Sequence, residues 1–264
     1  MTAEETPWEE VKMIPDFLNS NKSLLTVMLQ CKNPETAIGR MRNANACGAE
    51  AFGLQAECLK REYQNEETYK RIFSEAENKP IYVTNYRYDE NTGKTDETLA
   101  EEILGLARLN ADILDVMGDL FDIQPDQMAV DKTAIKKQEE LIKQIHKEKK
   151  LVLMSSHVFK FLPFEEVFKI ASEQRRRGAD IAKIVTAADT EEEEIENLRT
   201  TLLLKEKLDF PFLFLSIGTC SLHRRLGGRF GNFMTLCVYE HDAYSTPKQT
   251  LLNIAKAVRD EMGF

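Results

Sequence analysis

One lysine stands among apolar residues in the second half of the chain. Lys183 lies in the middle of residues 181–185, where its neighbours are isoleucine, alanine and valine, a composition typical of a buried β-strand. Burial disfavours the charged form of an amine, and an uncharged amine can attack a ketone and form a Schiff base. A lysine that is ion-paired, or whose ammonium reaches the rim of the fold, is the structural alternative.

A histidine and two arginines follow other apolar runs. His157 comes directly after Ser155 and Ser156, and an imidazole in such a place can act as a general acid or base near neutral pH. A histidine bonded by neighbouring backbone is the alternative there. Arg224 and Arg225 suit a carboxylate, because a guanidinium can bind one through two parallel hydrogen bonds. We expect one of these two arginines to be surface charge.

Eight short apolar runs, each followed by an amphipathic stretch, carry these residues. Such alternation predicts a parallel sheet covered by helices. Eight units in 264 residues fit an α/β fold of the (β/α)8 TIM barrel type, as a single domain over residues 1–264 in which residues 1–20 form an N-terminal arm. A doubly wound open sheet is the alternative, but no G-x-G-x-x-G turn follows the first strand. The expected strands are residues 24–29, 51–56, 81–86, 113–117, 151–156, 181–186, 212–217 and 233–238.

The helices expected between these strands have recognisable first residues. Asn33 is a plausible N-cap with Pro34 at the first helical position, and a later helix begins near Thr190. The other expected helices are residues 65–77, 96–110, 132–149, a helix from 163, a short one at 223–226, and a closing helix at 246–262.

Active sites of such barrels lie at the carboxyl ends of the strands. Polar side chains follow most of the expected strands at this end, and Ser245 and Gln249 there also suit a helix N-terminus. Besides the lysine and the arginines, these residues are Gln55, Glu57, Arg87, Asp89, Glu90, Asp115, Asp119, His157, Ser245 and Gln249.

Charge, hydropathy and cysteine spacing exclude several classes of function. A net charge of −9 argues against nonspecific nucleic-acid binding. No apolar run approaches the roughly 18–20 residues of a membrane span, and the N-terminus lacks the features of a signal peptide, so we expect a cytoplasmic protein without membrane contact. The five cysteines form no C-x-x-C pair, and the glutamates at 191–194 suit the first turn of a helix, so we expect no metal site.

Four segments, in chain order, resemble the type I 3-dehydroquinate dehydratases, the Schiff-base enzymes of the shikimate pathway. Residues 153–157 resemble the family's serine-x-histidine strand, and residues 178–184 resemble its lysine strand. Residues 225–231 resemble its arginine-leucine-x-glycine and phenylalanine-glycine segment, and residues 245–249 its serine-alanine-proline-glycine-glutamine lid. The resemblance covers nearly the whole chain. It implies an enzyme that acts on a small-molecule carboxylate without a cofactor; a homodimer is left open.

The same resemblance assigns roles to individual residues. Lys183 would form an imine with the substrate ketone, and His157 would remove the proton alpha to it and help the adjacent hydroxyl leave as water. The implied contacts are Arg225, Ser245 and Gln249 for the substrate carboxylate, Arg87 and Gln55 for the ring hydroxyls, and Glu90, in preference to Asp89, for orienting the histidine.

The second strand departs from the family pattern of glutamate, any residue, arginine. Gly53 and Gln55 occupy those positions and face the same side of the strand. We expect Gly53 to leave space near the substrate hydroxyls, so that Gly53→Glu with Gln55→Arg would improve catalysis on 3-dehydroquinate. Since hydroxyl contacts discriminate strongly between substrates, three hypotheses stand: dehydration of 3-dehydroquinate, elimination on another hydroxy-keto acid, and a non-catalytic barrel that binds a small carboxylate.

Overall fold

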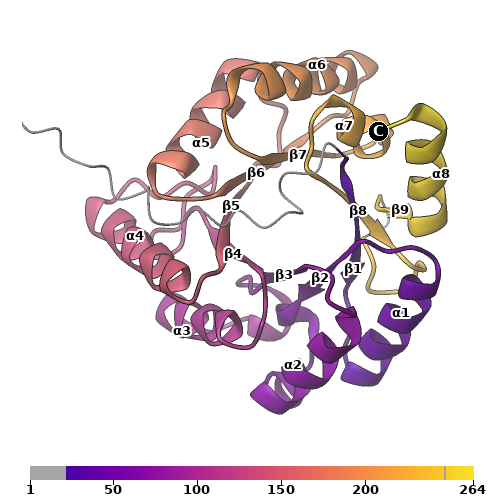
Figure 1. Ribbon diagram of the computed structural model, residues 1–264. Helices are drawn as coiled ribbons and strands as arrows, with labels where there is room; N and C mark the ends of the chain where they lie inside the picture. Colours follow the sequence, from indigo (N-terminus) through magenta and orange to yellow (C-terminus); the bar gives the residue numbers. More distant parts are fainter. Residues whose placement is uncertain (1–21, 247) are drawn as a thin grey trace, which may run out of the picture.

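The apolar runs form strands that lie side by side and are all parallel. In the computed structural model, which describes residues 22–246 and 248–264, the hydrogen-bonded order is β7-β6-β5-β4-β3-β2-β1-β8-β9. The row curls into a ring (Figure 1), and its two sides meet where the Phe233 amide donates to the Phe212 carbonyl over 3.2 Å. The strands are β1 (Leu24–Leu29), β2 (Ala51–Gln55), β3 (Ile81–Thr84), β4 (Ile113–Met117), β5 (Leu151–His157), β6 (Ile181–Ala187), β7 (Phe212–Ile217), β8 (Met234–Val238) and β9 (Thr250–Leu251).

Helices cover the outside of this ring (Figure 1). They are α1 (Pro34–Ala46), α2 (Glu66–Phe73), α3 (Asp96–Ala107), α4 (Lys132–Lys147), α5 (Phe164–Arg176), α6 (Glu191–Lys207), α7 (Leu222–Phe230) and α8 (Leu252–Met262). Short 3-10 turns at Ala56–Cys58, Arg61–Tyr63, Ser74–Ala76 and Asp89–Asn91 add to the connections. The expected single-domain (β/α)8 barrel is confirmed. The expected N-terminal arm falls outside the described residues.

The closing helix differs most from its expected position. It begins at Leu252, because Thr250–Leu251 first pairs with β8 as the extra strand β9. Ser245 and Thr246 therefore belong to a loop and cap no helix. α7 also extends further than expected, to Phe230.

Two helix starts were correctly predicted from their capping residues. Asn33 accepts a hydrogen bond from the Thr36 amide at 2.9 Å, with Pro34 at the first helical position. Thr190 forms a capping box with Glu193, in which each side chain accepts a hydrogen bond from the other residue's backbone. No helix in the described part of the chain is long and apolar enough to cross a membrane.

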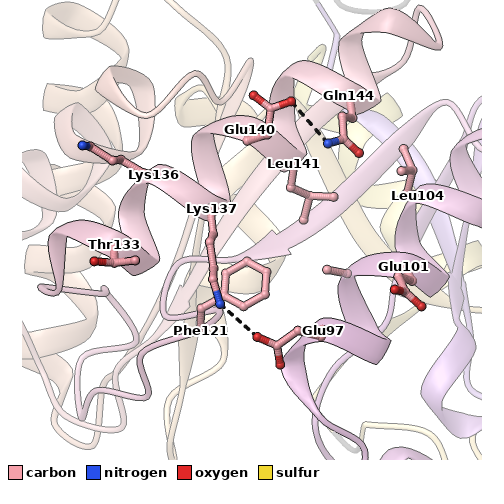
Figure 2. Close-up of a pocket in the computed structure, with 11 residues that line it drawn as sticks. Glu97, Glu101, Leu104, Phe121, Thr133, Lys136, Lys137, Glu140, Leu141 and Gln144 are labelled. Atoms are coloured by element: carbon pink, nitrogen blue, oxygen red, sulfur yellow. Dashed lines mark hydrogen bonds and ion pairs between the residues drawn. The ribbon is translucent and has the colours of Figure 1, made fainter.

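A surface groove of about 470 Å³ lies between α3 and α4, in the helix layer. Figure 2 shows Lys137 reaching Glu97, with a nitrogen–oxygen distance of 3.0 Å, beside the ring of Phe121. The remaining lining comes from the outer faces of the two helices. This groove is therefore separate from the strand ends.

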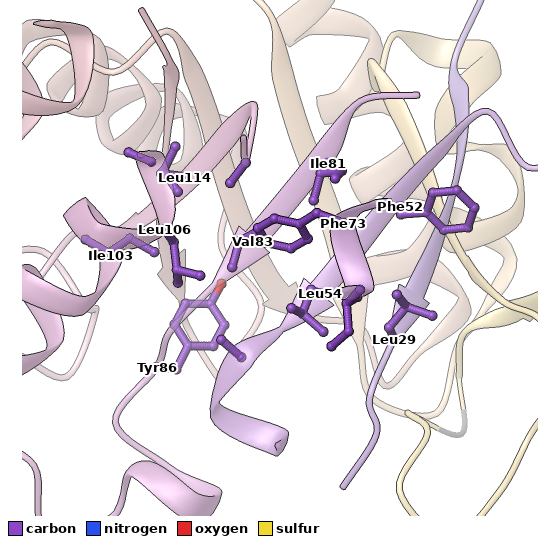
Figure 3. Close-up of a cluster of buried hydrophobic side chains, with 14 of the residues drawn as sticks. Leu29, Phe52, Leu54, Phe73, Ile81, Val83, Tyr86, Ile103, Leu106 and Leu114 are labelled. Atoms are coloured by element: carbon purple, nitrogen blue, oxygen red, sulfur yellow. The ribbon is translucent and has the colours of Figure 1, made fainter. Parts of the chain in front are cut away.

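Alternate residues of each strand pack into two different cores. Phe52, Leu54 and Val83 point outward and pack with residues of the covering helices such as Ile103 and Leu106 (Figure 3). The residues between them point into the ring, where a second cluster includes Met28, Tyr82, Ile113, Leu153, Ile181 and Val185. Because side chains alternate along a strand, Asp115, Ser155 and Lys183 share the inner side with this second cluster.

The capping box of α6 gives a test of local stability. Thr190→Ala removes the acceptor of the Glu193 amide and should lower the free energy of unfolding by about 1 kcal/mol. Urea unfolding followed by circular dichroism measures this change. Thr190→Ser keeps the hydroxyl and is the control, so equal losses in both variants would contradict the capping role.

Candidate active site

Lys183 extends from β6 into the ring, and its side chain is only 6% exposed. Its Nζ donates to the hydroxyl of Tyr82 at 2.8 Å, to the hydroxyl of Tyr86 at 2.6 Å and to Oδ2 of Asp115 at 3.1 Å. An ammonium group has three N–H donors, so these contacts engage all of them. The lysine was expected to be buried, with an ion-paired lysine as the structural alternative, and it is both buried and ion-paired.

Asp115 is the acidic partner of this lysine and is fully shielded from solvent. Its Oδ2 also accepts hydrogen bonds from the hydroxyls of Tyr82 and Tyr86, the latter at 2.5 Å, and its Oδ1 accepts one from Ser155 at 2.5 Å. Burial and the negative charge of Asp115 hold the pKa of both tyrosines well above the ordinary value. The two rings therefore remain neutral phenols that bridge the lysine and the carboxylate.

His157 ends β5 beside the same cluster. Its ring stands edge-on to that of Tyr86, with centroids 5.4 Å apart. The backbone N–H of His157 donates to Oε1 of Gln127 at 2.8 Å, and the ring Nδ1 lies 2.9 Å from the same oxygen. Because that oxygen only accepts hydrogen bonds, Nδ1 carries the ring proton, and Nε2 keeps its lone pair.

The charge state of His157 follows from its surroundings. Burial, together with the positive charges of Lys183 and Arg224, lowers its pKa to about 3, against the opposing effect of Asp115. The imidazole is neutral at physiological pH. A neutral ring with a free Nε2 is suited to accept a proton from a bound molecule.

Of the two adjacent arginines, Arg224 faces this cluster. Its Nε donates to the carbonyl of Ser216 on β7 at 2.6 Å, and burial lowers its pKa to about 10, which leaves it a cation. No carboxylate of the described residues lies within ion-pairing distance of it. Arg225 is exposed and contacts only Ser221, in its own helix. Arg225 was expected to face the site, but successive helix residues point about 100° apart, and the start of α7 turns Arg224 inward.

The loop after β8 lies near the end of β1. The Thr246 amide donates to Oε1 of Gln30 at 2.8 Å, and Ser245 caps a tight turn by accepting from the Asp242 amide at 2.9 Å. Gln249 is buried, and its Oε1 has no hydrogen-bond partner among the described atoms. The loop thus supplies a buried polar acceptor beside the strand ends.

Comparison with known proteins agrees with this geometry. The family model described as Type I 3-dehydroquinase matches residues 25–259. The chain belongs to the type I 3-dehydroquinase family.

Curated relatives of this 3-dehydroquinase family member are named 3-dehydroquinate dehydratase. One from Clostridium kluyveri is 31% identical over 161 residues, which is 60% of this chain and 60% of the relative. Another from Alkaliphilus oremlandii is 33% identical over 129 residues, 48% of this chain and 46% of the relative. The chain therefore matches less than two thirds of the length of these relatives.

Solved structures support the fold assignment. The type I 3-dehydroquinate dehydratase of Clostridium difficile, determined with covalently modified comenic acid, has a TM-score of 0.77 at 18% identity and covers 93% of this chain and 94% of that one. The enzyme of Geobacillus kaustophilus has a TM-score of 0.77 at 16% identity, with 93% of each chain covered. At these identities the likeness establishes the barrel alone.

Two residues expected in the site make other contacts. Arg87 forms ion pairs with Asp96 and Asp119, each at 2.7 Å, because the alternation of β3 continues past its end and places Tyr86 inward instead. Glu90 lies at the rim, 3.5 Å from the ammonium of Lys32. Within the described residues, Gln127 is the side chain that orients His157, in place of the expected Glu90.

Gly53 does not leave the expected space beside the substrate-binding end of β2. A Cβ added there would lie 2.2 Å from Sδ of Met28 and 3.2 Å from a ring carbon of Tyr82. Met28 and Tyr82 fill the volume. A glutamate at position 53 must displace Met28, so the expected gain from Gly53→Glu with Gln55→Arg has no structural basis.

Gln55 and Glu57 form a buried polar cluster at the end of β2. The amide of Gln55 donates to the Tyr88 hydroxyl at 3.0 Å, while its Oε1 is buried without a partner in the described structure. Glu57 is fully buried and accepts a hydrogen bond from Thr84 at 2.9 Å. Burial is the main cause that raises the pKa of Glu57 to about 7.

Three residues of the site were not predicted from the sequence to belong to it. Tyr82 and Tyr86 lie four residues apart, the spacing that puts both on one face of an extended segment, and this was the available signal. Gln127 lies 30 residues before His157, and nothing in the local sequence marks it.

The raised pKa of Glu57 predicts a loss of stability with rising pH. Its pKa is about 7 in the folded state and 4.5 ordinarily, so the folded state is penalised as pH rises from about 4.5 to above 7. Glu57→Gln removes this penalty. The unfolding free energy of the variant, relative to the parent, should increase by about 2–4 kcal/mol between pH 4.5 and pH 8.

Urea unfolding at several pH values checks this prediction. The exposed Glu62→Gln is the control, and its difference from the parent should stay nearly constant. A constant difference for Glu57→Gln would show that the Glu57 carboxyl does not change its charge over this range.

Proposed function

We propose that this chain is a Schiff-base-forming lyase that dehydrates 3-dehydroquinate to 3-dehydroshikimate, a cytoplasmic enzyme of the shikimate pathway. One observation carries the proposal: a buried lysine, a neutral histidine with a free Nε2, and an arginine that pairs with no carboxylate of the described residues lie together at the strand ends. The family match and the named relatives support the same reaction. The covalently modified comenic acid in the C. difficile enzyme supports covalent chemistry in this barrel.

In the proposed reaction, Lys183 forms the covalent bond to the substrate and His157 transfers the proton. The amine of Lys183 attacks the substrate ketone, and the carbonyl oxygen leaves as water, which produces a protonated imine. The imine withdraws electrons, so Nε2 of His157 can remove a proton from the adjacent carbon. The resulting imidazolium returns that proton to the hydroxyl on the next carbon, which departs as water. Hydrolysis of the imine then releases the unsaturated ketone and the free lysine.

Binding is assigned to the remaining polar groups. Arg224 is placed to hold the substrate carboxylate, since a cation without an acidic partner favours an anion. The unpartnered oxygens of Gln55 and Gln249 are suited to accept hydrogen bonds from substrate hydroxyls.

One feature of the site favours a hydroxy-keto acid other than 3-dehydroquinate as the substrate. Met28 and Tyr82 fill the space beside Gly53, and the neighbouring Gln55 is uncharged. Beside Gly53, the site therefore offers an uncharged amide, and no arginine, to the hydroxyl-bearing end of a substrate. An acid with fewer hydroxyls than 3-dehydroquinate is the alternative substrate for the same imine chemistry.

Trapping with borohydride tests the proposal. With 3-dehydroquinate and borohydride, the parent should gain the mass of a reduced adduct on Lys183, and dehydroshikimate should form, as followed by its ultraviolet absorbance. Lys183→Ala should show neither. The exposed Lys160→Ala is the control and should behave as the parent. A parent that forms no adduct with 3-dehydroquinate or another hydroxy-keto acid would exclude the imine mechanism.

The two arginines should differ sharply. Arg224→Ala removes a charge-assisted contact and should weaken carboxylate binding about 10- to 100-fold, which steady-state kinetics measures as an increase in KM. Arg225→Ala is the matched control one residue away, with an unchanged KM expected. A larger effect at Arg225 would contradict the assignment of the inward arginine.

A further inference from the structure

Lys183 must lose a proton before it can act as a nucleophile. All three of its N–H donors are engaged, by Tyr82, Tyr86 and Asp115. A protonated amine has no lone pair with which to attack a ketone. Before an imine can form, one proton must leave Nζ for a group within reach.

Asp115 is the one carboxylate within 4.0 Å of Nζ in the part of the chain that the structure describes. The other charged or titratable groups acting on the cluster are His157, which is neutral, Arg224, which is a cation, and Glu57, whose charge acts on Tyr82. His157 is not among the hydrogen-bond partners of Nζ, which are Tyr82, Tyr86 and Asp115. Asp115 is therefore the nearest base.

Two phenols connect the lysine to this base. The Tyr86 oxygen lies 2.6 Å from Nζ and 2.5 Å from Oδ2 of Asp115, so it accepts from one and donates to the other. The Tyr82 hydroxyl makes the same pair of contacts. A proton can thus pass through either hydroxyl over two short hydrogen bonds, or directly over 3.1 Å.

We propose that Asp115, with Tyr82 and Tyr86 as relays, is the catalytic base that converts the Lys183 ammonium into the attacking amine. This inference rests on the proposed imine chemistry. The proton transfer and the imine formation balance without another reagent. The ammonium gives one proton to the carboxylate, and the amine adds to the ketone. A second proton then moves from nitrogen to the former carbonyl oxygen. Asp115 returns its proton to that hydroxyl, which leaves as water, and the protonated imine remains beside a regenerated carboxylate.

A purely structural role for Asp115 predicts the opposite kinetics. If the carboxylate only holds the ammonium in place, its removal takes away a stabilising negative charge, and the lysine loses its proton more readily. Asp115→Asn would then form the imine as fast as the parent or faster at neutral pH. If Asp115 receives the proton, the same variant forms the imine more slowly, and its rate rises with pH as hydroxide replaces the carboxylate.

The experiment measures the rate of imine formation alone. Each protein is mixed with 3-dehydroquinate, quenched with borohydride at intervals, and weighed by mass spectrometry between pH 6 and pH 10. For Asp115→Asn we expect a rate about 10²-fold or more below that of the parent at pH 7, with recovery toward pH 10. A rate at pH 7 equal to or above the parent's would overturn the inference.

Tyrosine variants test the relay and protect against a misfolded Asp115 variant. Tyr82→Phe combined with Tyr86→Phe keeps both rings and should slow imine formation more than either single change. Tyr69→Phe, in α2, is the control and should match the parent. An unchanged rate in the double variant would overturn the relay. A parent that forms no adduct with 3-dehydroquinate would overturn this inference and the proposed function together, whereas normal trapping in the parent and all variants would overturn this inference alone.

Discussion

The ion pair between Lys183 and Asp115 inside the barrel is the constraint on which the other features of the site depend. Two charges removed from water are costly to the folded state unless their remaining hydrogen-bonding capacity is used. Here the ammonium has three partners, and the carboxylate accepts four hydrogen bonds when that from Ser155 is included. Four strands or their extensions, from β3 to β6, must keep their register for these contacts to form together.

Charge is distributed unevenly around this pair. On the β7 side stands Arg224, a cation that forms no ion pair with any described residue. On the β2 side are Gln55, the Tyr88 hydroxyl and Glu57, whose pKa burial raises to about 7. An elongated ligand with one anionic end can therefore enter in only one favourable orientation, with that end toward α7.

The strands themselves could be predicted from sequence, and so could the placing of Lys183 in a buried strand and of His157 at a strand end. The apolar runs left open which side of its strand Lys183 faces, and they did not mark Tyr82 as part of the site. Arg224 and Arg87 lie beyond strand ends, where one residue of offset reverses the direction of a side chain. Met28 fills the space at Gly53 from the neighbouring strand, and such a contact between distant segments leaves no mark in local sequence. Gln127 escaped prediction for the same reason.

The partner of His157 has a consequence for how strongly this residue holds a proton. A carboxylate next to the imidazole would stabilise the imidazolium, and the ring would then keep a captured proton longer. Gln127 offers a neutral amide oxygen, which fixes the ring orientation without supplying negative charge. An amide also does not titrate, so the orientation of the ring is the same in acid and in alkali. His157 is therefore a weak base in a fixed position, and a proton that it captures is readily given back.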